Sequence, residues 1–316
     1  MQVIRYEAAL RSVWDDAVTA SGNATFLFYR DYMEYHRDRF EDVSLLFFVK
    51  GKCLGLLPAS LHGRQVRSHG GLTYGGLLKS PQVGYTLTAA MLDAAAEYYT
   101  RELAAESLLY KPLPYIYTAY PAQEDLYWLF SRQATLVSRG LSATIDLDHP
   151  LPLSKLRRRK TAKALRSGVA VRRGQGDDDW RLFWDILTEV LATRHGCSPV
   201  HSLSEIRALK KAFPERISLH LACVDHRPVA GCVGYDTGRV MHVQYIAANA
   251  EGRNCGALDS LFEQFIEECR HEGKVFLDFG ISTERNGEWL NEGLQFQKEG
   301  LGGRATCYDQ YLLNWK

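Results

Sequence analysis

The residues best suited to bind a ligand form a glycine-containing turn ahead of an amphipathic helix. The turn runs from Gly252 to Gly256 and follows the β-rich run RVMHVQYIA, which ends at Ala247. The start of a helix presents free backbone N–H groups and the positive end of the helix dipole, a combination that suits a phosphate. A pyrophosphate-bearing cofactor is therefore the first hypothesis. A plain strand, turn and helix with nothing bound explains the same residues.

Two further stretches carry residues that could face a ligand. The segment Ser68 to Gly76 holds four glycines, with His69 and Tyr74 between them. Glycine permits close backbone approach, which serves a ligand-facing loop and a plain β-bulge equally. Residues 155 to 173 hold nine lysines and arginines and no acid. This run is either a solvated face or an edge for a polyanion such as CoA, a sugar nucleotide, tRNA or an anionic membrane surface.

Hydrophobic periodicity identifies the helices that must position these segments. After the turn, apolar residues recur at the spacing of one helix face: Leu258, Leu261, Phe262, Phe265, Ile266 and Cys269. We also expect a helix from about Phe28 to Phe40, and one after Ser154 that is capped by Ser154 and anchored by Leu156 and Leu165. Three strands in an antiparallel meander precede the turn, and the strand Val275 to Phe279 follows its helix.

Length and composition bound the class of protein. The 316 residues favour two domains, and a charged fraction of 24% is ordinary for a soluble globular chain. A formal net charge of +1 provides no global field that would attract nucleic acid or a membrane. The seven cysteines are scattered without a CxxC pair, which favours reduced thiols in the cytoplasm over disulfides or a metal site. No secretory signal and no long apolar run is present, so no stable membrane insertion is expected.

The two halves of the chain echo one another. SLLFFVKGKCLGLLPA and SLHLACVDHRPVAGCV each read as strand, polar turn and strand, followed by a glycine-bearing segment, a helix and a strand. His149 to Pro152 reads as a linker between domains at 1–150 and 151–316. The fold class is α/β of the α+β type, with two mixed, mainly antiparallel sheets flanked by helices. A Rossmann domain is disfavoured because hairpins replace strict alternation and no GxGxxG occurs.

This order of elements resembles the GNAT acyltransferase fold. The run LDFGIS at 277–282, and the glycine-rich NEGLQFQKEGLGG at 291–303, are similar to the Fem-like branch, which carries two such domains in tandem. Three positions depart from the pattern, one of which is Leu301, at the place of the second Phe of the glycine-rich element. Leu258 stands where the GNAT pyrophosphate loop has a small residue, and Gln297 separates Phe296 from Lys298. The resemblance implies a donor-binding C-terminal domain and an acceptor-side N-terminal domain.

The resemblance also implies a set of site residues. It places the pyrophosphate of acyl-CoA on backbone N–H groups at Arg253, Asn254, Cys255, Gly256 and Ala257. The acyl carbonyl would lie beside the strand from Met241 to Ile246, with His242 as base and Tyr245 as acid. Strict alternation would put His242 and Gln244 on one face of that strand and Val243 and Tyr245 on the other.

Further roles follow for both domains. Asp278 would orient the amine, and Lys298 would stabilise phosphate or oxyanion charge. The candidate substrate-binding residues are His69 and Tyr74, in the segment Ser68 to Gly76 where the acceptor side is expected, together with Gln244 on the strand and Glu284 in the loop after Asp278. A Cys–His nucleophile pair using Cys255 or Cys197 has no support in the spacing.

Three functions remain open at this point. The leading one is a cytoplasmic N-acyltransferase that uses acyl-CoA, such as acetyl-CoA, and no metal. Its acceptor would be an amine of a small molecule, plausibly an amino sugar nucleotide or a cell-envelope precursor. The second is a Fem-type transferase that uses aminoacyl-tRNA, which the basic helix would serve. The third is an inactive module that binds a ligand without turnover.

Overall fold

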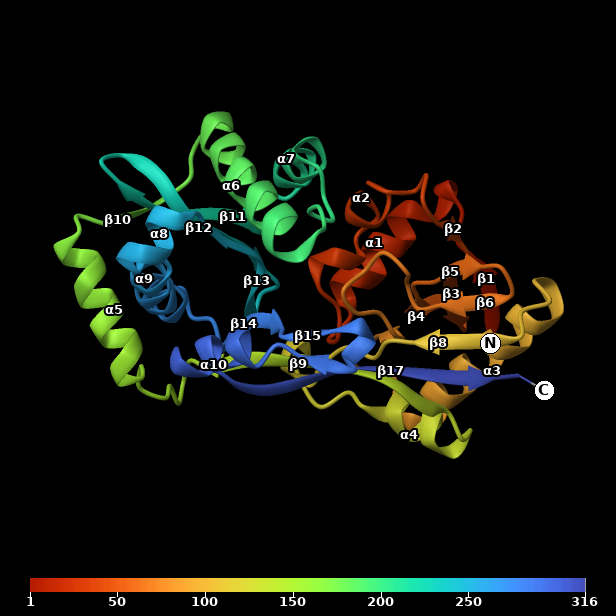
Figure 1. The fold of residues 1–316 in the computed structure, drawn as a ribbon. Coiled ribbons are helices and arrows are strands. Elements are labelled where there is room, and N and C mark those ends of the chain that lie inside the picture. Colours follow the sequence, from red (N-terminus) through yellow and green to blue (C-terminus); the bar gives the residue numbers. More distant parts are fainter. Residues whose placement is uncertain (316) are drawn as a thin grey trace. The chain divides into compact units, whose positions relative to one another are not determined.

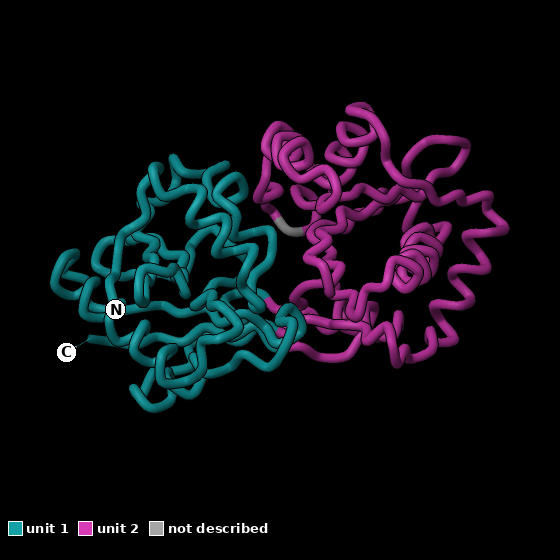
Figure 2. The backbone as a smooth tube through the Cα atoms, turned by 180° about the vertical axis from the view of Figure 1, so that it is seen from behind, with its two compact units in different colours: residues 1–140, 284–289, 307–316 teal, residues 141–283, 290–306 magenta. Residues whose placement is uncertain are grey.

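The computed structural model describes residues 1–315, and for His195 only its place in a helix. The chain divides into two compact units, coloured separately in Figure 2. Unit 1 comprises residues 1–140, 284–289 and those from 307 onward, and unit 2 comprises residues 141–283 and 290–306. The expected boundary at residue 150 differs from this division, because two long strands, Thr135–Asp146 (β9) and Arg304–Asn314 (β17), continue from one unit into the other.

Unit 2 is built on one mixed sheet. Besides β9 and β17, its strands are β10 (Ala170–Arg173), β11 (Ile217–Val224), β12 (Arg227–Asp236), β13 (Val240–Ala248) and β14 (Phe276–Ile281). They lie in the order β10-β11-β12-β13-β14-β9-β17 (Figure 1). The strands β10 to β13 form the predicted antiparallel meander, and β13 and β14 run parallel. The two-strand ribbon β15 (Thr283–Glu284) and β16 (Trp289–Leu290) is separate.

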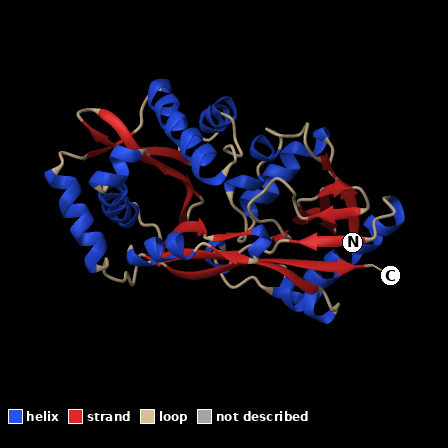
Figure 3. Ribbon diagram, in the orientation of Figure 1, coloured by secondary structure: helices blue, strands red, loops and turns tan. Residues whose placement is uncertain are grey.

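Helices cover both faces of this sheet, as Figure 3 shows by colour. They are α5 (Lys155–Arg166), α6 (Asp177–His195), α7 (Leu203–Ala212), α8 (Ala250–Cys255), α9 (Ala257–His271) and α10 (Glu292–Gly300). Gly231 and Gly234 of β12 lie on opposite faces. A side chain at Gly231 would meet Phe183 of α6, and one at Gly234 would meet Phe265 of α9. The sheet is therefore sandwiched between α6 on one side and α9 on the other.

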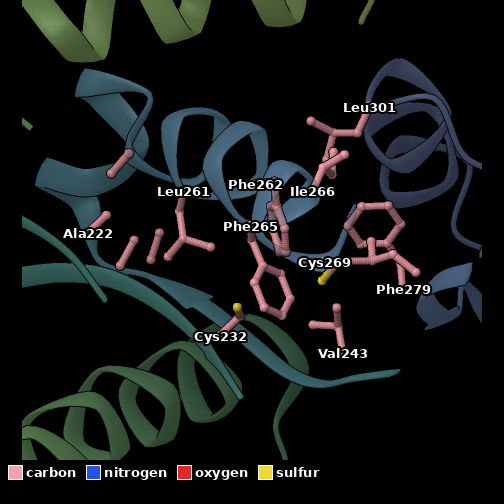
Figure 4. Close-up of a cluster of buried hydrophobic side chains, with 14 of the residues drawn as sticks. Ala222, Cys232, Val243, Leu261, Phe262, Phe265, Ile266, Cys269, Phe279 and Leu301 are labelled. Atoms are coloured by element: carbon pink, nitrogen blue, oxygen red, sulfur yellow. The ribbon is translucent and has the colours of Figure 1, made fainter. Parts of the chain in front are cut away.

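The predicted apolar face of α9 forms the core of unit 2. Leu261, Phe262, Phe265, Ile266 and Cys269 are all buried, and Leu258 packs at the edge of the same cluster. Figure 4 shows these side chains against Val243 of β13 and Phe279 of β14. Burial of five such side chains, at about 1.5–3 kcal/mol each for the larger ones, fixes α9 on the sheet. The start of α9 is therefore held at one place relative to β13.

Unit 1 repeats the same plan with shorter strands. Its strands are β1 (Gln2–Arg5), β2 (Glu41–Asp42), β3 (Leu45–Val49), β4 (Lys52–Leu57), β5 (Ser60–His62), β6 (Gln65–Arg67), β7 (Leu78–Lys79) and β8 (Ser107–Tyr110). Its helices are α1 (Arg11–Ala20), α2 (Arg30–Met33), α3 (Tyr85–Glu102) and α4 (Glu124–Ser131). They lie against two strand sets, β1-β3-β4-β7 and β17-β8-β6-β5-β2.

One parallel strand pair occurs in each unit and confirms the repeat. In unit 1, β6 pairs in parallel with β8, and α3 lies between them in the chain. In unit 2, β13 pairs in parallel with β14, and α9 lies between them. The predicted mixed, mainly antiparallel sheets are confirmed. The helix predicted from Phe28 to Phe40 is wrong in length, because α2 ends at Met33 and turns follow.

The glycine-rich segment Ser68 to Gly76 packs inside unit 1. A Cβ at Gly75 would lie 1.7 Å from the carbonyl oxygen of Ser68, and one at Gly71 would lie 2.0 Å from the His36 ring. Close packing within the unit therefore accounts for these two glycines. His69 and Tyr74 are each only 2% exposed. Their substrate-binding role stays a prediction.

Candidate active site

The parallel strands β13 and β14 separate part-way along their length. They pair at Val240–Phe276, Met241–Leu277 and His242–Asp278, and no later pair follows within residues 1–315. On its other side β13 stays paired with β12 as far as Ala248. The edge of β13 that faced β14 is therefore left without a strand partner over its second half.

A pocket of about 530 Å³ lies where the two strands separate. Its walls come from Val243–Ala248 of β13, from Phe279 and Ile281 of β14, from the end of α6 with the loop after it, and from α10. All of these residues belong to unit 2. The lining is mainly apolar, and Arg194, Arg253 and Lys298 provide its cationic groups. The pocket therefore suits an elongated ligand that carries a negative group.

A β-bulge in β13 changes which side chains share a face. Gly234 pairs with Val243 and Val233 with Tyr245, which leaves Gln244 as an extra residue. Met241 and Val243 join the core under α9, and so does Ala248 after the bulge. Tyr245 lies on the opposite face, where its ring packs edge-on against Trp184 of α6 at 5.2 Å. The expected alternation is therefore wrong, because one inserted residue reverses the parity of the strand.

Asp278 is the buried centre of a polar cluster at the last β13–β14 pair. Its carboxylate is fully buried, and Nδ1 of His242 lies 2.8 Å from Oδ2. The hydroxyls of Ser142 and Thr144 donate to Oδ1, the latter at 2.9 Å. His242 is 8% exposed and does not line the pocket. The structure brings together two residues that the sequence singled out separately, and neither lines the pocket.

Lys298 is the buried cation that lines the pocket. It lies on α10, is 3% exposed, and its Nζ donates to the carbonyl oxygens of Gly280 at 2.7 Å and Ile281 at 3.0 Å. Burial lowers the pKa of this ammonium to about 8, and the nearby Asp278 charge opposes that shift. An ammonium has three N–H donors, and these two carbonyl oxygens account for two of them.

Tyr245 lines the pocket and anchors the loop between α6 and α7. The backbone N–H of His201 donates to the Tyr245 hydroxyl at 3.2 Å, and Nδ1 of His201 lies 2.5 Å from the same oxygen. Burial raises the pKa of Tyr245 to about 12. Because its hydroxyl already bonds to His201, Tyr245 holds the loop in place in this structure. The resemblance implies that Tyr245 donates a proton to the leaving group, and that role stays a prediction.

The segment expected to cradle a pyrophosphate is a short helix, α8, and not an open turn. The N–H of Gly252 bonds to the Asn249 side chain, that of Arg253 to the Asn249 carbonyl, and that of Gly256 to the Gly252 carbonyl. Three of the local N–H groups are thus satisfied within the chain. Gly256 has φ +83°, and a Cβ there would lie 2.7 Å from the Lys160 carbonyl oxygen, so α5 packs directly on this glycine.

The remaining predicted residues fall into two groups. Arg253 and Gln244 line the pocket, and a guanidinium nitrogen of Arg253 donates to the Ala248 carbonyl at 2.6 Å. Asn254, Cys255, Gly256 and Ala257 do not line it. Glu284 belongs to unit 1 and is exposed, and His69 and Tyr74 are buried in unit 1. The structure therefore brings together the residues of β13, β14 and α10.

Sequence reasoning missed Ser142, Thr144 and His201. The first two alternate with apolar Ala143 and Ile145 along β9, and polar residues on one face of an otherwise apolar strand are a detectable signal of a buried polar cluster. His201 lies in the loop between α6 and α7. Its bond to Tyr245 joins residues 44 positions apart, which no local pattern reveals.

Among the side chains that the structure describes, no group of three or more His, Cys, Asp or Glu residues is placed to hold a metal ion. No helix within residues 1–315 has the length and apolar character required to cross a bilayer.

Comparisons with known proteins agree on the fold. Residues 154–288 match the family model described as an acetyltransferase (GNAT) domain. No curated protein matches the chain. The structure is similar to the crystal structure of FemX, with a TM-score of 0.68 and 13% identity over 98% of this chain and 97% of that one.

Two other solved structures are also similar. One is the C-terminal domain of a putative lysylphosphatidylglycerol synthetase from Agrobacterium fabrum, with a TM-score of 0.61 and 12% identity over 97% of this chain and 92% of that one. The other is a tandem GNAT protein from the clavulanic acid biosynthesis pathway, with a TM-score of 0.54 and 14% identity over 99% and 98%. The chain therefore has the Fem-like double-GNAT fold that the sequence predicts.

Proposed function

We propose that unit 2 is an N-acyltransferase that moves an acyl group from a thioester donor to an amine. The observation that carries this proposal is the pocket of about 530 Å³ between the separated strands β13 and β14, with Lys298 in its wall. The match of residues 154–288 to an acetyltransferase (GNAT) domain supports an enzyme of the acyltransferase type.

The free edge of β13 suits a donor with an extended, amide-containing arm. Residues Val243–Ala248 line the pocket along this edge, and β14 no longer pairs with them. An extended chain can add to such an edge by backbone-type hydrogen bonds, as peptides do when they join a sheet. The pantetheine arm of acyl-CoA carries two amides and has this shape. Arg253 and Arg194 stand at the same pocket to meet its phosphates.

Lys298 supplies the charge that the reaction needs. The amine nitrogen attacks the thioester carbonyl, the C–N bond forms, the C–S bond breaks, and the amine proton ends on the departing sulfur. The third N–H of Lys298 can stabilise the oxyanion or pass a proton to the thiolate. A pKa of about 8 matches that of a thiol, so this transfer is nearly balanced in free energy. Asp278 and His242 act as positioning residues that hold the end of the paired strands.

A second candidate is transfer of an aminoacyl group from tRNA. Two of the five N–H groups expected to hold a pyrophosphate, those of Arg253 and Gly256, are bonded inside the chain. That observation weakens the usual CoA geometry and favours a donor without a pyrophosphate at this point. One structural neighbour is named a putative lysylphosphatidylglycerol synthetase. In either case we propose a cytoplasmic enzyme with a cell-envelope precursor or amino sugar nucleotide as acceptor.

Donor binding and thiol release separate the candidates. Acetyl-CoA and longer acyl-CoAs should raise the thermal midpoint of the protein by mass action, and CoA release should depend on an added amine. The test variant is Lys298→Met, which should still bind acyl-CoA but release CoA at least ten-fold more slowly. No stabilisation by any acyl-CoA, together with salt-sensitive retention of aminoacyl-tRNA, would replace the first candidate with the second. Binding of acyl-CoA without CoA release for any amine would leave only a binding module.

A further inference from the structure

Helix α5 presents a cationic face to solvent. At 100° per residue, five cations fall within an arc of about 140° on the helix wheel. All five are exposed: Lys155, Arg158, Arg159, Lys163 and Arg166. The opposite side of the helix carries the buried Arg157, Thr161 and Ala164, which pack toward unit 2. The basic run of the sequence therefore splits into an inner and an outer face.

Three of the other four cations of this run form ion pairs within the chain. Arg157 forms a buried ion pair with Asp259 of α9 at 2.8 Å. Arg172 pairs with Asp179, and Arg173 pairs with Glu268 and Glu272. In the part of the chain that the structure describes, the five cations of the outer face take part in no such pair. Their charge is thus available to an external partner, although the chain as a whole is near neutral, with a formal charge of +1.

A large apolar side chain lies at the border of the cationic arc. Leu165 is 62% exposed, so its predicted role as an anchor of α5 is wrong. Leu151, in the segment that leads into α5, is 43% exposed. An exposed leucine next to arginines fits the interfacial zone of a lipid bilayer, where apolar side chains enter the acyl boundary and cations meet headgroup phosphates.

We propose that the outer face of α5 binds an anionic membrane surface. Residues 151–168 contain no aromatic side chain and no Asn or Gln. Single-stranded nucleic acids are bound through stacked aromatic side chains, and bases are read by amides or arginines in a groove. A convex helix face with cations and an exposed leucine fits a flat lipid surface better. The proposal concerns peripheral adsorption and does not depend on the acyl-transfer reaction.

The expected strength follows from the number of charges. Each Lys or Arg near an anionic surface contributes a factor of about 5 to membrane partitioning at moderate salt. Neutralising three of the five should therefore lower partitioning by roughly two orders of magnitude. Because the Debye length shrinks to about 3 Å at 1 M salt, binding should also disappear at high ionic strength.

Vesicle sedimentation with the full chain tests the proposal. The probes are vesicles of phosphatidylglycerol mixed with phosphatidylcholine, and vesicles of phosphatidylcholine alone. The variant is R159Q/K163Q/R166Q. The control K50Q/K52Q/K211Q removes the same charge from exposed side chains that also form no ion pair in the described residues. We expect binding to the anionic vesicles only, lost in the first variant and kept in the control. A second variant, Leu165→Ser, should weaken binding several-fold without changing net charge.

Several outcomes would overturn the proposal. These are equal loss of binding in variant and control, equal binding to neutral vesicles, and an unchanged affinity for anionic vesicles in the α5 variant. Retention of a structured RNA that depends on the same three cations, with no retention on vesicles, would assign the face to nucleic acid instead. Matching thermal midpoints for wild type, variant and control would show that α5 remains folded in each.

Discussion

Nδ1 of His242 lies 2.8 Å from Oδ2 of Asp278, at the last position where β13 and β14 are paired. The other carboxylate oxygen accepts from Ser142 and Thr144 of β9, so three neighbouring strands meet at one buried acid. An ionised carboxylate can only accept hydrogen bonds, so with Asp278 ionised the imidazole proton lies on Nδ1. This bond therefore sets the tautomer of His242 and joins the strands where the pocket begins.

Two substitutions of Asp278 distinguish its effect on the tautomer of His242 from its effect on the stability of the fold. Asp278→Ala leaves two hydroxyls and an imidazole buried without their acceptor, so we expect a loss of about 2–4 kcal/mol in the free energy of unfolding. Asp278→Asn should cost less and should move the imidazole proton to Nε2, because the amide can donate to Nδ1. Urea denaturation and ¹⁵N NMR of the histidine would measure the two effects. The control Asp185→Asn changes an exposed acid, and a comparable loss there would contradict the explanation.

The depressed pKa of Lys298 predicts a pH-dependent difference in stability. With a pKa of about 8 in the folded state and about 10.5 in the unfolded chain, the unfolded state binds more protons between these values. The stability of the wild type should therefore rise relative to that of Lys298→Met as pH increases from 8 to 10. The measurement is urea unfolding of both proteins at several pH values. If the difference in unfolding free energy between the two proteins does not change over this pH range, burial does not lower the pKa of Lys298.

The same group predicts the pH dependence of acyl transfer. If the ammonium form of Lys298 stabilises the oxyanion, kcat/KM should fall as pH rises through about 8. The residual activity of Lys298→Met should lack this transition. A profile in the variant that still falls at pH 8 would assign the titration to another group.

The bond between Tyr245 and His201 predicts a mobile loop when it is removed. Tyr245→Phe keeps the ring against Trp184 but removes the hydroxyl that two His201 nitrogens contact, at a cost of about 1 kcal/mol. Hydrogen exchange should accelerate around residue 201, which measures the loosening directly. The control Tyr127→Phe changes a hydroxyl on a residue that is 58% exposed and should have no such effect. Unchanged exchange at His201 would mean that other contacts hold the loop.

Two glycines with left-handed backbones differ in their surroundings. Gly168 has φ +72° with open space around it, whereas a Cβ at Gly256 would press on the Lys160 carbonyl oxygen. We expect Gly168→Ala to cost about 1 kcal/mol from backbone strain alone, and Gly256→Ala to cost about 1–2 kcal/mol more. Thermal unfolding of both variants compares them. Equal losses would show that α5 shifts away from α8 without penalty.

The sequence predicted the parts of the fold that depend on periodicity and local caps. The six apolar residues of α9 lie on one buried face or at its edge. Ser154 is the N-cap of α5, and its side chain accepts a hydrogen bond from the Arg157 N–H. Hydrophobic spacing and capping act within a few residues, so one sequence contains the necessary information. The repeat was also detectable, because both halves carry the same order of elements.

The features that sequence reasoning missed depend on contacts between distant segments. The bulge at Gln244 reverses the faces of β13, and nothing in the residues around it distinguishes an inserted position from regular alternation. The residues expected as a turn, Gly252 to Gly256, form the end of the helix α8 and its C-cap, because Asn249 caps the start of that helix and α5 packs on Gly256. The glycines of residues 68–76 relieve crowding with Ser68 and His36, which only the folded unit shows.

The path of β17 has a consequence for how such a chain can be inherited. Residues 311–314 pair with β8 of unit 1, although they follow unit 2 in the chain. If the two units arose by duplication, the terminal strand of the second copy now completes the first. A gene truncated at codon 150 would encode unit 1 without one of its strands, and a crossover there between diverged relatives would pair strands of different ancestry. Selection should therefore keep the two units together as one heritable block.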